Sequence, residues 1–479
     1  MGILSNLEPR EVFHYFEEIC SIPHPSYKEE KISNYLVDFS KERGLEYYQD
    51  ELKNVIIIKE AAKGYEDVEP MILQGHMDMV CEKEPDCTID FEKDGLSLEI
   101  IGDYISAKGT TLGGDDGIAL AYALAVLDSD SIPHPRIEFV CTVSEEVGME
   151  GATGIDLSML KGKRLMNLDS EEEGILLVGC AGGCSAECNL PLNWIEAEGE
   201  TLELVVEGLI GGHSGAEIDK GRGNSNILMG RILMEALAVT PVFVAELEGG
   251  NKDNAIPRET KARVVVKDVE AFRKTVDQSA KAMREEFSIT DPDIKVKVKA
   301  AKEKVTEVLD EVTNQKVITL LNTLPNGIQT MSANIPGLVE TSLNLGVLRL
   351  GKEQLSLRFS VRSSVGTAKK HLLQKLDFIL RQFGGSVQLH GDYPAWEYKK
   401  DSKLREDMVR IYETMYGKTP EIQAIHAGLE CGILTGKIEG LDCVSIGPDM
   451  MSIHTTQEKL SISSTKRVWE YLLEVLKKK

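Results

Sequence analysis

Long apolar runs, basic charge and paired cysteines are all scarce in this sequence of 479 residues. No window approaches the roughly 18 uninterrupted apolar residues that a membrane-spanning helix needs. With 42% hydrophobic and 28% charged residues, the composition is that of a globular protein, and we expect neither a membrane-embedded nor a disordered chain. The formal net charge of −24 argues against nucleic acid as a partner, because phosphate binding draws its affinity from basic side chains.

The N-terminal stretch lacks a basic region followed by an apolar segment, and we therefore expect a cytoplasmic protein. The nine cysteines include no CxxC pair, and reduced thiols fit this odd number best. Cys180, Cys184 and Cys188 recur every four residues, which leaves a soft-metal site open as an alternative. Gly182 and Gly183 argue against that alternative, because they interrupt any helix that would align the three thiols.

The length of the chain predicts two domains. In the first part of the chain, apolar runs typical of strands occur at residues 54–59, 71–74, 137–143 and 164–168. Helical patterns lie between them, for example at residues 118–127. This alternation predicts an α/β fold with a mostly parallel central sheet. From about residue 186 the pattern changes to that of an α+β domain. We therefore expect a discontinuous α/β domain, residues 1–185 and 392–479, with an inserted α+β lid at 186–391.

A weak internal repeat is visible in the predicted lid. Residues 261–266, a strand pattern leading into helical 269–287, resemble residues 355–360 leading into helical 368–383. Duplication of a strand-helix unit explains the resemblance. The alternative is that any α+β domain repeats such a pattern.

Two neighbouring carboxylates, Asp115 and Asp116, lie in a glycine-rich turn just before the apolar helical run. Such a pair repels itself and usually implies a cation or a helix N-terminus nearby. We predict that Asp116 caps the helix that Gly117 opens. Asp115 would then face the other way, where it could bind a metal ion.

Other residues with metal-binding or acid-base chemistry follow the predicted strands. In open α/β sheets, ligands gather at the carboxyl ends of the strands, so these residues could converge. Together they provide the donor set of a paired divalent site, namely His76, Asp115, Glu146, Asp169 and His454. Imidazole with carboxylate suits zinc, and a shared carboxylate can hold two ions about 3.5 to 4 Å apart.

In this arrangement His76 and Asp169 would bind one ion, Glu146 and His454 would bind the other, and Asp115 would lie between them. Taken singly, each residue has a simpler interpretation. His454 could be a hydrogen-bonded core histidine, and Glu145 with Glu146 could be a solvated pair. The joint pattern favours the metal site.

The motifs Gly75-His76-Met77-Asp78, Gly113–Gly117 and Glu145–Gly148, followed by Asp169 and His454, resemble those of the co-catalytic zinc exopeptidase and aminoacylase family. This family includes carboxypeptidase G2-like enzymes and carnosinases. Within it, the long lid and three further motifs are most similar to those of the bacterial cytosolic aminoacyl-histidine dipeptidases, also called Xaa-His or β-Ala-His dipeptidases. These three motifs are Gly211–Gly215, Gly221–Asn226 and His426–Glu430.

The resemblance implies that the five donor residues hold two divalent ions, chiefly Zn²⁺, with Mn²⁺ or Co²⁺ as alternatives. Glu145 would be the general base, and Asp78 would orient His76. The last role has a physical basis, because a ligating imidazole usually donates its other N–H to a carboxylate. The family also implies a cis peptide bond between Asp115 and Asp116.

For the substrate, the resemblance implies that His213 stabilises the developing oxyanion in the transition state. Asn254 and Arg362 would hold the carboxylate end of the substrate, since the planar guanidinium can donate two parallel hydrogen bonds. The alternative for Arg362 is an ordinary exposed surface residue. Gly428 and Glu430 would line the subsite for the free amino end.

The implied function is metal-dependent hydrolysis of unblocked dipeptides, including Xaa-His substrates, by an α/β catalytic domain with a lid. One alternative is an N-acyl amino acid deacylase with the same metal centre. Another is a non-catalytic metal-binding or peptide-binding module, which the presence of Glu145 disfavours. We expect small dipeptides as the partners and no nucleic acid or membrane. The protein would be a monomer or a homodimer, and His213 would act in its own chain or across the dimer.

Overall fold

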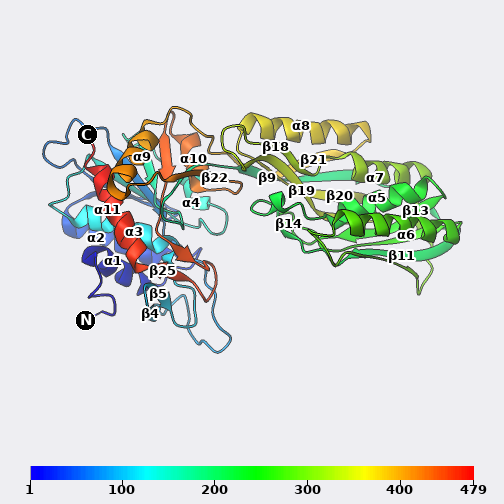
Figure 1. Cartoon of the computed structure of the whole chain (residues 1–479), viewed down its shortest axis with the longest axis horizontal. Helices are drawn as coiled ribbons and strands as arrows, with labels where there is room; N and C mark the ends of the chain where they lie inside the picture. The colour runs from blue at the N-terminus through cyan, green and yellow to red at the C-terminus, as the bar shows by residue number, and fades with distance from the viewer. Residues whose placement is uncertain (1) are drawn as a thin grey trace. The chain divides into compact units, whose positions relative to one another are not determined.

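The computed structural model describes residues 2–479, which form two compact units (Figure 1). Unit 1 contains the residues up to Gly179, together with Tyr398–Ala424 and Leu429–Lys479. Unit 2 contains Cys180–Glu397 and the short segment Ile425–Gly428. The predicted domain boundaries lie a few residues away, and residues 425–428 belong to unit 2 and not, as predicted, to the catalytic domain. Among the described residues, no helix is long and apolar enough to cross a membrane.

A mixed eight-stranded sheet forms the centre of unit 1, in the order β1-β2-β6-β3-β7-β23-β8-β22. The four central strands β6, β3, β7 and β23 are parallel, and the pairs β1–β2, β2–β6 and β23–β8 are antiparallel. The predicted α/β class is confirmed, and parallel pairing is confined to the central strands. The pair at one edge is antiparallel because a short turn joins β1 to β2. The strands are β1 Glu46–Gln49, β2 Val55–Lys59, β3 Met71–His76, β6 Ile137–Thr142, β7 Arg164–Asn167, β8 Ile175–Cys180, β22 Glu421–Ile425 and β23 Asp442–Ser445.

Helix α3 (Gly114–Asp128) lies in the core of unit 1. All its residues from Gly114 to Leu127 are buried, as expected for a helix that is apolar on every side. It packs against β3 and α1, and Tyr122 stacks on Trp469 of α11 with ring centroids 6.0 Å apart. The start of α3, which carries the Asp115 turn, is therefore held firmly. The other helices are α1 Arg10–Cys20, α2 Glu30–Arg43, α4 Glu150–Gly154, α9 Lys403–Tyr416, α10 Glu430–Lys437 and α11 Ile462–Leu476.

A small antiparallel sheet, in the order β24-β25-β5-β4, joins the C-terminal part of the chain to residues near position 100. Leu460 pairs with Ile105, and Met450 pairs with Leu460. The loop between β24 and β25 carries His454, so this sheet determines where that histidine lies. These short strands carry no periodic signal in the sequence. They are β4 Leu98–Ile101, β5 Tyr104–Ala107, β24 Met450–Met451 and β25 Lys459–Ser461.

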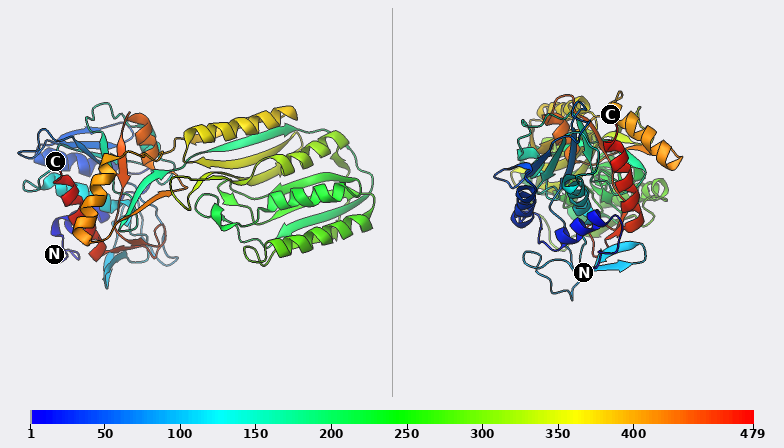
Figure 2. Two further views of the ribbon diagram at one scale, coloured as in Figure 1. Left: turned by 45° about the horizontal axis from the view of Figure 1, so that its top comes forward. Right: turned by 90° about the vertical axis from the view of Figure 1, so that its left-hand side faces the viewer.

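An antiparallel sheet of nine strands forms unit 2, in the order β16-β11-β15-β13-β19-β20-β9-β21, with β18 paired to β19. Helices α5 to α8 cover one face (Figure 2), and the small β10–β17 sheet packs on the other. The strands are β9 Gly182–Pro191, β10 Trp194–Glu196, β11 Glu200–Glu207, β12 Gly212–His213, β13 Val242–Gly249, β14 Ala255–Ile256, β15 Thr260–Val266, β16 Lys295–Ala300, β17 Glu307–Leu309, β18 Gly327–Met331, β19 Val339–Leu350, β20 Gln354–Ser363 and β21 Ser386–Tyr393. The helices are α5 Ser225–Leu237, α6 Val269–Glu286, α7 Glu311–Thr323 and α8 Gly366–Gln382, with a short 3₁₀ turn at Ile218–Lys220.

Unit 2 contains the same arrangement twice. In chain order, one half contains β11, α5, β13, β15, α6 and β16, and the other contains β9, α7, β19, β20, α8 and β21. The first of these halves is inserted between β9 and α7 of the second. From outer edge to centre, the halves read β16-β11-β15-β13 and β21-β9-β20-β19, and they meet where β13 pairs with β19. The repeat seen in the sequence corresponds to β15-α6 and β20-α8, which occupy equivalent places. The structure therefore favours duplication over a generic α+β pattern.

Phe359 on β20 tests how far this sheet depends on its buried face. Phe359 is fully buried, whereas Phe378 on α8 is 67% exposed. We expect Phe359→Ala to lower the free energy of unfolding by about 3 to 5 kcal/mol, because it leaves a cavity in the core. Phe378→Ala should change it by less than about 0.5 kcal/mol. Urea unfolding followed by circular dichroism measures both, and equal losses would contradict this description of the core.

Candidate metal centre and active site

Three neighbouring parallel strands carry the candidate ligands at their carboxyl ends. His76 ends β3, Glu145 and Glu146 follow β6, and Asp169 follows β7. The structure brings these side chains together with Asp115 and His454. Potential ligand atoms lie within 4.8 Å of one another in three groups, namely His76 with Asp116 and Asp169, His76 with Glu145 and Glu146, and Asp115 with Glu146 and His454.

The Asp115 carboxylate lies between the two histidines. Its Oδ1 is 3.1 Å from His76 Nε2, and its Oδ2 is 3.0 Å from His454 Nε2. Asp169 Oδ1 is 3.6 Å from His76 Nε2, and Glu146 Oε1 is 2.9 Å from His454 Nε2. Each histidine therefore shares Asp115 and has one further carboxylate beside it. This is the grouping that a bridging Asp115 requires.

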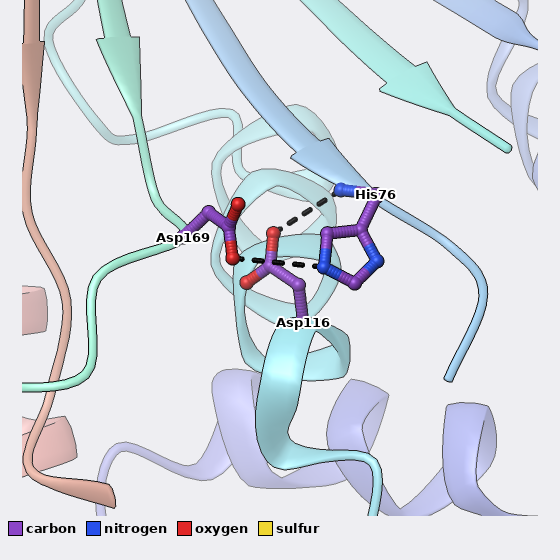
Figure 3. Close-up of side chains that lie close together, drawn as sticks. All are labelled: His76, Asp116 and Asp169. Carbon is purple, nitrogen blue, oxygen red and sulfur yellow. Dashed lines mark hydrogen bonds and ion pairs between the residues drawn. The ribbon is translucent and has the colours of Figure 1, made fainter. Parts of the chain in front are cut away.

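Asp116 does not cap helix α3, so that prediction is wrong. The backbone of Asp115 and Asp116 is not helical, and within the described chain the Asp116 side chain accepts no hydrogen bond from the N–H groups of the helix that follows. The Asp115–Asp116 peptide bond is cis, as the family resemblance implies, and Asp116 Oδ2 accepts a hydrogen bond from the His76 backbone N–H at 3.1 Å. Figure 3 shows the carboxylates of Asp116 and Asp169 next to each other, on the same side of the His76 ring. Asp116 is fully buried, and its other oxygen has no hydrogen-bond partner among the described residues.

A distant side chain, Glu458, accepts the backbone N–H groups of the turn before Asp115. Its carboxylate accepts hydrogen bonds from the backbone N–H groups of Leu112 at 2.7 Å, Gly113 at 3.2 Å and Gly114 at 2.8 Å. Sequence reasoning missed this residue. The only signal was an acidic side chain four positions after a candidate ligand histidine, which does not by itself indicate a partner far away in the chain.

Asp78 contacts both the His76 ring and the backbone of Glu145 and Glu146. The Nδ1 atom of His76 is 3.0 Å from the Asp78 backbone carbonyl and 3.5 Å from its carboxylate. The carboxylate also accepts the backbone N–H groups of Glu145 at 3.0 Å and Glu146 at 3.3 Å, and the hydroxyl of Ser26 at 2.8 Å. Burial opposes its ionisation, but the hydrogen bonds from His76 and Glu145 outweigh burial and lower the pKa of Asp78. Asp78 thus holds both the His76 ring and the Glu145–Glu146 backbone in place.

The charge of this cluster is unbalanced. Asp115, Asp169 and Glu146 have side chains that are at most 10% exposed, and their ion pairs within the described chain are with histidines only. Burial raises the pKa of Asp169 to about 6 and that of Glu171 nearby to about 7, and it raises the pKa of Glu145 well above the usual range. Buried carboxylates in excess of their basic partners are stabilised by bound cations. Together with the imidazole donors, this excess fits divalent ions.

His213 belongs to unit 2, at the end of β12. Its Nδ1 accepts hydrogen bonds from the backbone N–H groups of Gly215 at 3.3 Å and Ala216 at 3.0 Å. The proton of the neutral ring therefore lies on Nε2, which is left as a donor. Burial and the neighbouring Arg362 lower the pKa of His213, so the ring stays neutral near pH 7.

Arg362 on β20 is only 9% exposed, so the interpretation as a surface arginine is wrong. Its Nη1 donates to the Tyr393 hydroxyl at 3.3 Å, and its Nε has no partner among the described residues. A Cβ atom on Gly215 would lie 3.0 Å from His213 and 3.2 Å from Arg362. It would also lie 2.6 Å from the backbone carbonyl oxygen of His426, so only glycine fits at this position. Since no carboxylate of the described chain forms an ion pair with it, the Arg362 guanidinium is buried without a negatively charged partner.

The other predicted substrate residues lie in different surroundings. Asn254 is exposed, and its carbonyl accepts the backbone N–H of Ser214, beside His213. Gly428 is partly exposed and belongs to unit 2. Glu430 in unit 1 is fully buried, and its carboxylate accepts hydrogen bonds from Gln74 and Thr142, both at 2.6 Å. Burial raises the pKa of Glu430 to about 7.

Histidine and carboxylate ligands at the carboxyl edge of an α/β sheet, with a further acidic side chain beside them, are typical of a metal-dependent hydrolase. Residues 72–478 match the peptidase family M20/M25/M40, and the chain belongs to this family. The predicted family and enzyme class are thereby confirmed, and the protein is a metallopeptidase that hydrolyses peptide bonds.

Two relatives that are more than 30% identical match the chain over almost its whole length. The cytosol non-specific dipeptidase of Escherichia coli (strain K12) is 38% identical over 492 residues, which cover 100% of this chain and 99% of that protein. The solved structure of the aminoacylhistidine dipeptidase from Vibrio alginolyticus is 35% identical, has a TM-score of 0.94, and covers 99% of this chain and 98% of that one. An aminopeptidase from Bacillus cereus, 18% identical with a TM-score of 0.56 and 98% coverage of both chains, shares the fold.

Metal binding to this centre should release protons. Hydrogen bonds with Asp115 and Glu146 raise the pKa of His454 to about 10, and burial raises the pKa of Asp169 to about 6. A divalent ion needs neutral imidazole and ionised carboxylate, so it competes with these protons. We expect the affinity for Zn²⁺ to rise by about tenfold per pH unit for each proton released. Calorimetric titration in buffers of different ionisation enthalpy measures the release, and an affinity independent of pH between about 5.5 and 7.5 would contradict it.

Proposed function

We propose that the protein is a dipeptidase with a two-metal centre, and that it cleaves unblocked dipeptides, including some of the Xaa-His or β-Ala-His type. The observation that carries the proposal is the Asp115 carboxylate, with one oxygen directed at each of the two histidines. The names of the two full-length relatives, a non-specific dipeptidase and an aminoacylhistidine dipeptidase, support this substrate class. The first of these names also supports a cytoplasmic location.

The proposed ligands are His76 and Asp169 for one ion, Glu146 and His454 for the other, and Asp115 for both. Zn²⁺ suits this donor set best, and Mn²⁺ or Co²⁺ are alternatives. Ions held by these residues would polarise the scissile carbonyl and lower the pKa of a bound water molecule.

Glu145 is the proposed general base. It is next to Glu146 in the chain, and its backbone N–H is fixed by Asp78. Burial raises the pKa of Glu145, which brings its proton affinity closer to that needed near pH 7. Glu145 would accept a proton from the attacking water while the oxygen bonds to the carbonyl carbon. It would then pass that proton to the amine nitrogen as the C–N bond breaks.

Unit 2 supplies the proposed contacts to the substrate. The Nε2–H of His213 is free to donate to an oxyanion. Arg362, buried without a carboxylate partner, would bind the free carboxylate of the dipeptide, with Asn254 as a further donor. His213 and Arg362 lie together in unit 2, and His213 would act in its own chain or across a homodimer. Gly428 remains a candidate for the amino end, whereas the buried Glu430 would stabilise the strand ends.

A small substrate panel tests this function directly. We expect turnover of β-Ala-His, Ala-His or Leu-Gly, and little turnover of a tripeptide, an N-acetyl amino acid or a C-terminally amidated Leu-Gly. The amide removes the carboxylate that Arg362 would bind. Turnover of the N-acetyl amino acid without turnover of the free dipeptides would establish a deacylase instead. A metal-replete protein that cleaves none of these compounds would favour the binding module.

The two adjacent glutamates should respond differently to substitution. Glu145→Gln keeps the shape but cannot accept a proton, so turnover should fall by about 10² to 10⁴ fold while both ions stay bound. Glu146→Ala removes a proposed ligand and should weaken the binding of one of the two ions. Elemental analysis beside steady-state kinetics distinguishes these results. Near-normal turnover by metal-replete Glu145→Gln protein would exclude Glu145 as the base.

A further inference from the structure

The turn that leads into Asp115 is held by a side chain from the other end of the chain. Glu458 Oε2 accepts the N–H groups of Leu112 at 2.7 Å and Gly113 at 3.2 Å. Its Oε1 accepts the N–H of Gly114 at 2.8 Å and lies 3.5 Å from the N–H of Asp115. One carboxylate thus faces four consecutive backbone N–H groups.

This arrangement satisfies two requirements at once. The first N–H groups of a helix have no partner within the helix, and Gly113 at the start of α3 has no side chain that could serve as one. A carboxylate there is also favoured by the helix dipole. Glu458 is only 3% exposed and needs several donors to stay ionised. A Cβ atom on Gly114 would lie 3.3 Å from Glu458 Oε1, so the glycine allows this close approach.

The same short segment also carries a candidate metal ligand. His454 precedes Glu458 by four residues in the loop between β24 and β25, and Glu458 N–H closes a turn on the Thr455 carbonyl at 3.1 Å. His454 therefore contacts the carboxylate of Asp115, while Glu458 holds the backbone just before it.

We propose that Glu458 is a positioning residue for the metal centre, which acts by fixing the 112–115 backbone so that the Asp115 carboxylate reaches both ions. The proposal rests on the two-metal function proposed above. Because Asp115 would be shared by the two ions, loss of this support should lower the affinity of the protein for both of them. A residue that served only as a helix cap would stabilise the fold and leave the metal affinity unchanged.

The test compares Glu458→Gln with the wild-type protein. Glutamine retains one acceptor oxygen but turns an N–H₂ group toward backbone N–H groups. We expect both ions to bind about 10- to 100-fold more weakly, the usual effect of losing a residue that orients metal ligands. Competition of Zn²⁺ with a chelator measures the affinities, and elemental analysis measures the stoichiometry. The rise in Tm on adding Zn²⁺ should also shrink.

Asp310→Asn provides the matched control. Asp310 caps α7 in unit 2 by accepting the Thr313 N–H at 2.7 Å, so this variant also loses a carboxylate at a helix N-terminus. We expect Tm to fall equally with and without Zn²⁺, and the Zn²⁺ affinity to stay at the wild-type value. Glu458→Asp, which keeps the charge on a shorter side chain, should recover part of the lost affinity.

Each outcome has a distinct meaning. If the wild-type protein binds no divalent ion, the proposed metal function itself fails. If it binds two ions and Glu458→Gln binds them equally well, Glu458 is only a helix cap and the positioning role fails. If Glu458→Gln does not fold, as judged by circular dichroism, the affinity of Glu458→Asp decides: a value equal to the wild type overturns the proposal, and a weaker value for both ions supports it.

Discussion

The Asp115 carboxylate, shared by His76 and His454, is the contact on which the candidate metal centre depends. The two histidines lie far apart in the sequence. They meet because parallel strands place His76 at the edge of the sheet, while the β5–β25 pairing brings the His454 loop to the same place. Helix α3, buried on all sides, fixes the start of the Asp115 turn. A two-metal centre therefore needs the chain to be folded from near one end to near the other.

The main cost of this arrangement is electrostatic. Several carboxylates lie together in a mostly buried place, with the two histidines as their ion-pair partners in the described chain. Such a cluster is unfavourable without bound cations, because each carboxylate loses hydration and repels its neighbours. Unit 2 shows the opposite imbalance, since Arg362 is buried without a carboxylate. One unit is thus suited to cations, and the other is suited to the anionic end of a substrate.

The sequence could predict the strands of unit 1 and the gathering of His76, Glu146 and Asp169, because apolar runs are local signals and strand ends share an edge. It could not predict which side chain meets the N–H groups before Asp115, since Glu458 is a partner from a distant loop. For the same reason Asp116 was misassigned as a cap. The burial of Glu430 and of Arg362 also depends on tertiary packing. The antiparallel pairing of β1 with β2 at the edge of the sheet depends on the short turn between them. The periodicity of apolar residues does not indicate the direction in which two strands pair.

The most direct test of the shared Asp115 carboxylate is a crystal structure of the protein with Mn²⁺ or Zn²⁺, located by anomalous scattering. The account predicts two anomalous peaks about 3.5 to 4 Å apart, each within coordination distance of a different Asp115 oxygen. His76 would lie at one peak and His454 at the other. A single peak, or two peaks of which neither contacts Asp115, would contradict it.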